Sequence, residues 1–426
     1  MSPLSFTHPD NRKVLVYRII IGCLVFLYLL NCLTPLRLHV DMLRYFAIKD
    51  CVELGCPPDS AAAKDYLPWG YTGLLLFLSK LGILKSFVLV LINCIYLFSS
   101  LYLIKKMFGA TINTFFFLLL ILLNWTTLKF VMHPLSEMQY LFFSVASLYL
   151  FQRYTDTGKI LFLLGSVVLG GIAFLTRSVG LALAAALVTG LLWQFRRELI
   201  ALIRRNRIFL SVILLAIIGT VIFSKQLGLN HYTGVFNKQF KEGVTILTII
   251  KWHFTEWSEL CFNLSIVKLI PFISYEKAKV LFIVTGILFF AGFIYLLFFR
   301  KNKIPFIIKV YLLFYAVLMF NWPFYDPRFW VPVTPFVAAM IAQLSFPVKR
   351  LGKMAAAVFL AGYLLSGLAS AGYLTYTSLH REVMARTHAN GVYRNEYETV
   401  FFGKPTSDTA RHIDPFVLSV IQRYDR

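Results

Sequence analysis

The sequence predicts an all-helical protein that crosses a membrane about eleven times. Of its 426 residues, 58% are hydrophobic and only 15% are charged, an apolar excess that excludes an ordinary soluble domain. Runs of about 17 to 22 residues almost free of charge recur along the chain, and each is long enough to cross a hydrocarbon core of about 30 Å as a helix. The runs lack the alternating pattern of a membrane β-barrel, and backbone groups in lipid need internal partners, so we expect only helices to cross.

Each expected span is one of these apolar runs. The first run is a span rather than a cleaved signal peptide, because the segment before it is short and basic and no A-x-A exit follows. Segment 70–84 is short and carries Lys80, and counting it as a span would invert every later loop, so we expect it to lie along the interface. The expected spans are 14–33, 86–104, 111–128, 135–152, 160–176, 179–195, 208–223, 279–299, 305–321, 329–345 and 354–375.

The charge distribution orients these spans. With the N-terminus in the cytoplasm, about one residue in three of the inner segments is Lys or Arg, against about one in eight of the outer segments, as the positive-inside rule requires. The net charge of +22 is therefore explained by inner loops, and nucleic-acid binding is not expected. The inner loops are too short for a nucleotide-binding domain and no phosphate-binding loop motif occurs, which excludes an ATP-driven pump.

The predicted organisation is a transmembrane domain over 1–375 and a short extracytoplasmic tail over 376–426. Two further outer segments, 34–85 and 224–278, interrupt the transmembrane domain, and these three segments offer room for chemistry outside the membrane. Cys51, Cys56 and Cys261 lie in them, so Cys51 could pair with Cys56 or with Cys261, or all three could stay as free thiols.

The first outer segment opens with a candidate base. Asp41, Arg44 and Tyr45 share one face of a predicted helix, since residues three and four apart are neighbours. A carboxylate close to the membrane surface can accept a proton from a hydroxyl while its neighbours hold its rotamer. The alternative is a surface aspartate that is simply paired with Arg44.

Two further charges lie at the outer ends of predicted spans. Glu137 sits just inside an apolar run, where a carboxylate costs about 2.5 to 3.5 kcal/mol, so it should face a protein cavity and have a partner. His133 precedes it and is either a ligand-binding or an interfacial side chain. Arg177 lies in the turn between two short spans, where it binds a phosphate or reaches to lipid head groups.

The turn after the ninth span is rigid and aromatic. Its sequence MFNWPFYDPRFWVPVTPF places Tyr325, Asp326 and Arg328 among four prolines, which suits either anion binding or an aromatic belt with a local ion pair. His231, Tyr232, Trp252, His253 and Trp257 in the outer segment 224–278 could stack on a sugar ring or anchor at the head groups.

Together these pieces resemble the GT-C glycosyltransferases, especially the family 39 branch that includes protein O-mannosyltransferases and lipid A aminoarabinose transferases. The resemblance covers roughly residues 14–345. It rests on DMLRY at 41–45, LPWGY at 67–71, HPLSE at 133–137, LTRSVGL at 175–181 and PRFWVPVTP at 327–335. The chain departs from the family in having a lone Asp41 where an acid pair is usual, Trp69 in a turn that is normally Pro-Pro-Gly-Tyr, and a tail of only about 50 residues.

The resemblance implies a GT-C-like fold and a reaction. The donor is expected to be a sugar on a polyprenyl phosphate, and the acceptor a hydroxyl on a lipid, glycan or protein at the extracytoplasmic face. Asp41 is the expected general base of a single inverting displacement, with Asp65 and Glu137 as the other candidates. The expected substrate-binding residues are Arg44, Tyr45, Asp65, Lys85, His133, Glu137, Arg177, Tyr325 and Arg328.

In this scheme Arg177, Arg328 or Lys85 would stabilise the departing polyprenyl phosphate. This scheme requires no metal, and no cofactor is expected. No D-x-D motif stands on an outer loop, which fits a lipid-linked donor better than a nucleotide sugar held through a divalent ion. The expected location is a multi-pass position in a membrane, namely a bacterial inner membrane with the site facing the periplasm, or the endoplasmic reticulum in a eukaryote.

Two other functions remain open. A transporter or flippase of lipid-linked saccharides would also have many helices with cations and aromatics, but it predicts coupled charges deep in the spans. A polysaccharide polymerase or ligase would use similar donors, with a large outer loop late in the chain.

Overall fold

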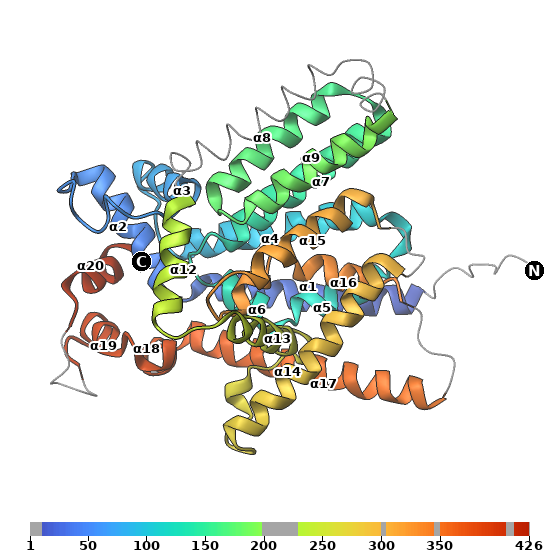
Figure 1. Cartoon of the computed structure of the whole chain (residues 1–426). Coiled ribbons are helices and arrows are strands. Elements are labelled where there is room, and N and C mark those ends of the chain that lie inside the picture. The colour runs from blue at the N-terminus through green and yellow to red at the C-terminus, as the bar shows by residue number, and fades with distance from the viewer. Residues whose placement is uncertain (1–10, 198–228, 300–303, 345–349, 406–412, 426) are drawn as a thin grey trace, which may run out of the picture.

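The computed structural model describes residues 11–197, 229–299, 304–344, 350–405 and 413–425. Every regular element in these ranges is a helix, as the sequence predicted (Figure 1). The α-helices are α1 (Asn11–Leu30), α2 (Val40–Leu54), α3 (Trp69–Lys80), α4 (Ser86–Phe108), α5 (Thr114–Leu122), α6 (Trp125–Val131), α7 (Glu137–Thr157), α8 (Ile160–Thr176), α9 (Gly180–Gln194), α12 (Leu229–Lys241), α13 (Ile246–Phe262), α14 (Tyr275–Ile294), α15 (Phe306–Phe320), α16 (Thr334–Ile341), α17 (Arg350–Leu379), α18 (Arg381–Thr387), α19 (Arg394–Phe402) and α20 (Pro415–Tyr424).

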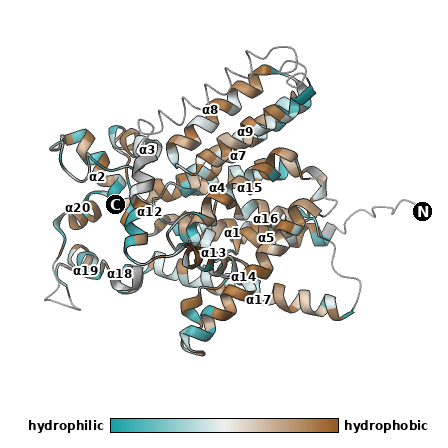
Figure 2. Ribbon diagram, in the orientation of Figure 1, coloured by the Kyte–Doolittle hydropathy of each residue, from teal (hydrophilic) through white to brown (hydrophobic). Residues whose placement is uncertain are grey.

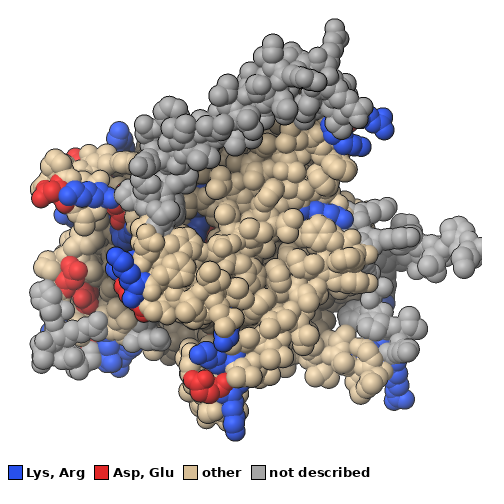
Figure 3. Space-filling model, in the orientation of Figure 1, with Lys and Arg blue, Asp and Glu red and all other residues tan. Residues whose placement is uncertain are grey.

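Several helices are suited to a membrane. Four helical stretches of the described chain are long and apolar enough to cross one, and the bent pair α5 and α6 counts as a fifth if it forms a single span. The four are Arg12–Leu33, Ser86–Thr111, Tyr275–Phe299 and Arg350–Leu379. Hydrophobic residues cover most of these helices in Figure 2, and charged side chains leave a broad uncharged band across the molecule in Figure 3. By their length and composition, these helices are consistent with a helical membrane protein.

The number of helices that pass this test is smaller than the eleven spans expected from hydropathy and charge. Three of the expected spans are apolar helices of 17 residues or fewer: α8, α9 and α15. The expected span 135–152 coincides with α7, which is 21 residues long and carries Glu137 in its first turn. The expected span 208–223 lies outside the described residues.

The expected span 111–128 is broken. Helices α5 and α6 meet at an angle of 64°, because Asn124 caps α6 through the Thr127 amide. Asn263 satisfies the backbone groups that the break exposes: its Oδ1 accepts from Trp125 N at 2.7 Å and its Nδ2 donates to Leu123 O at 2.7 Å. A break in a helix at membrane depth needs such partners.

The expected span 329–345 is also shorter than predicted. Residues Pro327–Trp330 form a 3-10 turn and α16 begins only at Thr334. Pro332 and Pro335 lack the amide hydrogen that an unbroken helix requires, so the helix cannot extend back to Phe329.

The first outer segment and the chain end meet at one side of the molecule (Figure 1). Helix α2 carries Asp41, as predicted, and α3 corresponds to the helix expected over 70–84, although it ends at Lys80. Cys51 and Cys56 form a disulfide, which settles the pairing that the sequence left open, and Cys261 is free. Lys49 of α2 contacts the Tyr424 hydroxyl of α20 at 2.6 Å.

Candidate active site

Five sequence motifs that are far apart in the chain meet around one cavity of about 380 Å³. The cavity lies between the start of α2, the turn before α3, the turn between α6 and α7, the turn between α8 and α9, and the connection from α15 to α16. Six of the predicted site residues line it: Asp41, Arg44, Tyr45, Arg177, Tyr325 and Arg328.

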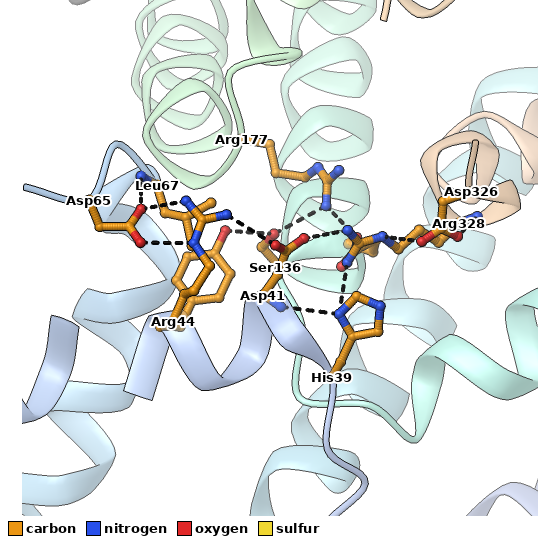
Figure 4. Close-up of polar contacts among 11 residues, drawn as sticks. His39, Asp41, Arg44, Asp65, Leu67, Ser136, Arg177, Asp326 and Arg328 are labelled. Atoms are coloured by element: carbon orange, nitrogen blue, oxygen red, sulfur yellow. Dashed lines mark hydrogen bonds and ion pairs between the residues drawn. The ribbon is translucent and has the colours of Figure 1, made fainter. Parts of the chain in front are cut away.

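Asp41 is held in the first turn of α2 between two arginines. His39 caps this helix, and its Nδ1 accepts a hydrogen bond from the Asp41 amide at 3.2 Å. Arg328 pairs with Oδ2 of Asp41, and Arg44 Nη1 lies 3.2 Å from Oδ1. Figure 4 shows the two arginines approaching the carboxylate from opposite sides. The local pair with Arg44 therefore exists, but it is only part of a larger network.

The protonation of Asp41 is set by opposing effects. Burial by itself would raise its pKa, but the charge of Arg328 and its hydrogen bond outweigh burial, and His39 and Arg44 add to them, so the pKa of Asp41 lies below its ordinary value. Burial and the neighbouring Arg328 both lower the pKa of His39. Asp41 is therefore a carboxylate at neutral pH, in a form that can accept a proton.

Glu137 has the partners that its depth predicted. Arg177 pairs with its Oε1, and Arg328 Nη1 lies 3.6 Å from the same oxygen. Arg177 Nη1 also donates to Ser136 Oγ at 3.2 Å, and Arg328 Nε lies 2.8 Å from Oδ2 of Asp326. Burial lowers the pKa of each guanidinium, but the Glu137 carboxylate and other neighbours raise it by more than burial lowers it. Both arginines therefore keep their charge.

Asp65 binds Arg44 and does not line the cavity. Its two carboxylate oxygens accept from Arg44 Nε and Nη2 at 2.8 and 2.7 Å. It also accepts the Leu67 amide at 3.0 Å, which fixes the turn before α3. Arg44 lies over the Tyr66 ring at 4.8 Å. Since Asp65 does not line the cavity and Asp41 does, the geometry favours Asp41 over Asp65 as the base.

Two motif glycines are required by close packing. A Cβ on Gly70, in the Pro-Trp-Gly-Tyr turn, would lie 2.8 Å from the Leu175 carbonyl oxygen and from Thr176. A Cβ on Gly180 would lie 2.5 Å from Cα of Phe174. These close approaches pack the start of α3 and the start of α9 against the end of α8, and so fix the backbone of Arg177.

A buried cluster on α13 supports the turn that carries Arg328, and it was not predicted. Oε1 of Glu256 accepts the Asp326 amide at 2.6 Å, and its Oε2 accepts Trp330 Nε1 at 2.7 Å. His253 lies with Nδ1 2.6 Å from Glu256 Oε2 and Nε2 2.9 Å from Trp322 O. Burial raises the pKa of Glu256, although His253 opposes this. The i, i+3 spacing of the two side chains places them on one face of a helix, but it does not indicate that they hold this turn.

The aromatic and histidine residues expected for sugar binding in segment 224–278 do not gather at the cavity. His253 and Trp257 are buried in the core of the protein, and Trp252 does not line the cavity. The side chains of His231 and Tyr232 lie outside the described part of the structure. The cavity takes its aromatic wall instead from Trp322, Phe324 and Tyr325.

Comparisons with known proteins identify no relative. No family model, no curated protein and no solved structure matches this chain.

Four of the predicted site residues do not line the cavity. Asp65 and Glu137 pair with arginines that do, whereas Lys85 and His133 stand apart from it. Lys85 lies at the start of α4, where its Nζ donates to the Arg423 carbonyl at 3.0 Å. His133 is buried behind the cavity, with Nδ1 2.8 Å from Lys129 O and its ring 5.5 Å from that of His388. Burial, followed by electrostatic effects of His388, Lys129 and Arg37, holds the pKa of His133 well below its ordinary range. Tyr45 is closer: it lines the cavity and donates to Ser136 Oγ at 3.2 Å.

The arrangement can accept a proton and bind an anion in one small space. Asp41 supplies the acceptor, and Arg177 and Arg328 supply fixed positive charge. A second cavity of about 440 Å³ is lined by Trp330, the residue after Phe329 of the first cavity, and mostly by apolar residues of α5, α13, α16 and α17. Among the described residues no group of three or more His, Cys, Asp or Glu side chains is placed to hold a metal ion.

Proposed function

We propose that this protein is a membrane glycosyltransferase that moves a sugar from a polyprenyl-phosphate donor to a hydroxyl acceptor. The observation that carries the proposal is the contact of a carboxylate with a buried arginine in a polar cavity, Asp41 with Arg328. A transferase of this kind needs both groups, one for the acceptor proton and one for the phosphate.

The proposed reaction is a single displacement. The acceptor hydroxyl gives its proton to Asp41 while its oxygen attacks the anomeric carbon of the donor. The bond between that carbon and the phosphate oxygen breaks, and polyprenyl phosphate leaves with one more negative charge than it had in the donor. Arg177 and Arg328 stabilise this charge. At comparable sites each hydrogen-bond donor to the developing charge contributes about 2.7 to 4 kcal/mol. The sugar is inverted at its anomeric carbon.

The two cavities suit the two parts of such a donor. The polar cavity accommodates the sugar and phosphate, with Tyr325 and the neighbouring aromatics as a stacking wall. The apolar cavity behind Trp330 accommodates the first isoprene units. We place the polar cavity on the extracytoplasmic side of a bacterial inner membrane, and we retain the proposal of about eleven spans because the positive-inside bias supports it.

Transfer from a radiolabelled polyprenyl-phosphate sugar tests the proposal. The purified wild type and Asp41→Asn are each supplied with donor and a membrane extract as acceptor. Product from the wild type alone supports a transferase that depends on Asp41, and the labelled product identifies the acceptor class. If neither protein yields product and the donor instead crosses reconstituted vesicles, the transporter alternative replaces this one.

A further inference from the structure

Side chains from a distant part of the chain bind the backbone of the segment that leads into the candidate base. Residues 34–39 join the 3-10 turn after α1 to α2 without forming a helix or strand, yet Leu36 and Leu38 are fully buried. Buried backbone amides and carbonyls require hydrogen bonds. Their partners therefore determine where α2 begins and where Asp41 stands.

These partners are three side chains of the C-terminal tail, about 350 residues later in the chain. Asp425 Oδ1 accepts the Leu36 amide at 2.7 Å. The Tyr397 hydroxyl donates to the Leu36 carbonyl at 2.5 Å and accepts the Leu38 amide at 2.9 Å. His388 Nε2 donates to the Leu38 carbonyl at 2.8 Å. The tail thus binds all four backbone polar groups of Leu36 and Leu38.

The three side chains are themselves held firmly. Tyr397 is fully buried in α19. Asp425 pairs with Arg381 of α18 at 2.5 Å. Burial and the charge of Arg37 lower the pKa of His388 to about 3, so its ring is neutral at physiological pH, and the Nε2 tautomer can donate to the carbonyl. Burial and ion pairing therefore hold these hydrogen-bonding groups in place in addition to their contacts with the segment.

We propose that the C-terminal tail is a built part of the active site and that Tyr397 is a positioning residue for Asp41. This inference rests on the proposed function. Only two residues separate Leu38 from Asp41, and the one next to Leu38, His39, binds the Asp41 amide and lies with Nδ1 3.5 Å from Arg328 Nη1. Loss of the Tyr397 hydroxyl leaves two buried backbone groups without partners and lets the base shift. A displacement of about 1 Å at a reacting group lowers a rate by about 10²-fold.

The test compares Tyr397→Phe with Tyr393→Phe in the full-length protein. Tyr393 is on the tail next to α19, and its hydroxyl makes no hydrogen bond within the described residues, so the control removes the same atom without the same contacts. We measure hydrogen exchange of the peptide covering 34–42, kcat and KM for transfer, and binding of polyprenyl phosphate. Tyr397→Phe should speed exchange of this peptide and lower kcat by about 10- to 100-fold, with KM and phosphate binding within about threefold. Tyr393→Phe should match the wild type in all four measurements.

Asp425 provides an independent pair of variants in case Tyr397→Phe does not fold. Asp425→Asn keeps an oxygen that accepts the Leu36 amide and should retain transfer, whereas Asp425→Leu should lose it. Unchanged exchange over 34–42 in Tyr397→Phe, or faster exchange with an unchanged kcat, overturns the positioning role. A wild type that transfers no sugar overturns the proposed function instead, and the exchange measurement still decides whether the tail holds the segment.

Discussion

Asp41→Asn separates the two proposed roles of the cavity, which are to accept a proton and to bind a phosphate. In the structure the Asp41 carboxylate is bound to Arg328 and Arg44, so a donor phosphate has to compete with it for Arg328. The substitution removes the base and also the competitor. We therefore expect transfer to fall by about 10²-fold or more, while polyprenyl phosphate binds more tightly than to the wild type.

The size of the second effect follows from the geometry. Two unit charges about 4 Å apart interact by about 4 kcal/mol at an effective dielectric constant of about 20. Because the Asp41 side chain is 26% exposed and water screens it, we take about a third of this, about 1.4 kcal/mol. That energy corresponds to about a tenfold lower Kd. Arg328 keeps Glu137 and Asp326 as partners, so its charge remains compensated in the variant.

Binding of polyprenyl phosphate is measured by isothermal titration or by tryptophan fluorescence in nanodiscs. Asp50→Asn is the matched control, because Asp50 lies on the same helix but pairs with Lys49 and Arg423 away from the cavity. It should bind and turn over like the wild type. A weaker or unchanged affinity in Asp41→Asn would show that the carboxylate does not compete with the phosphate, and normal turnover would refute its role as base.

Three further outcomes are expected. Arg328→Ala should weaken polyprenyl phosphate binding by about 10-fold or more and lower turnover as well, measured in the same titration and transfer assays. Gly70→Ala should reduce transfer by about 10-fold or more, because its Cβ meets the backbone beside Arg177, whereas Gly73→Ala on the same helix, where no atom lies within 4 Å, should transfer normally. Burial raises the pKa of Glu259 to about 7, so the folded state binds its proton more tightly and stability should fall as pH rises from about 4.5 to about 7; Glu259→Gln should remove this part of the pH dependence of Tm.

The fold was predictable where hydropathy decides it. The apolar runs gave the helices α4, α8, α9, α15 and α17 to within a few residues, because burial in lipid fixes both their length and their composition. The break between α5 and α6 was not predicted, since it depends on Asn263, which follows the end of α13 more than a hundred residues later. The shortened α16 could have been read from Pro332 and Pro335.

Residues of the candidate site were predictable where a charged side chain lies at the end of an apolar run. Glu137 and Arg177 are charges at the ends of apolar runs, and each therefore requires a partner; the structure pairs them with each other. His253 and Glu256 look like part of an amphipathic helix in sequence, and nothing local shows that they hold the 322–330 turn. Long-range contacts of this kind leave no periodic signal.

The pairing of Asp41 with Arg328 has a mechanistic consequence under the proposed function. Before the reaction, each charge reduces the effect of the other: Arg328 lowers the basicity of Asp41, and Asp41 occupies the cation that the phosphate needs. When the acceptor proton reaches Asp41, the carboxylate becomes neutral and Arg328 loses an anionic partner. The positive potential at the phosphate therefore rises at the moment when the leaving group gains negative charge. Proton transfer and stabilisation of the leaving group are coupled through one ion pair, and a phosphate that binds Arg328 makes Asp41 a stronger base for the acceptor hydroxyl.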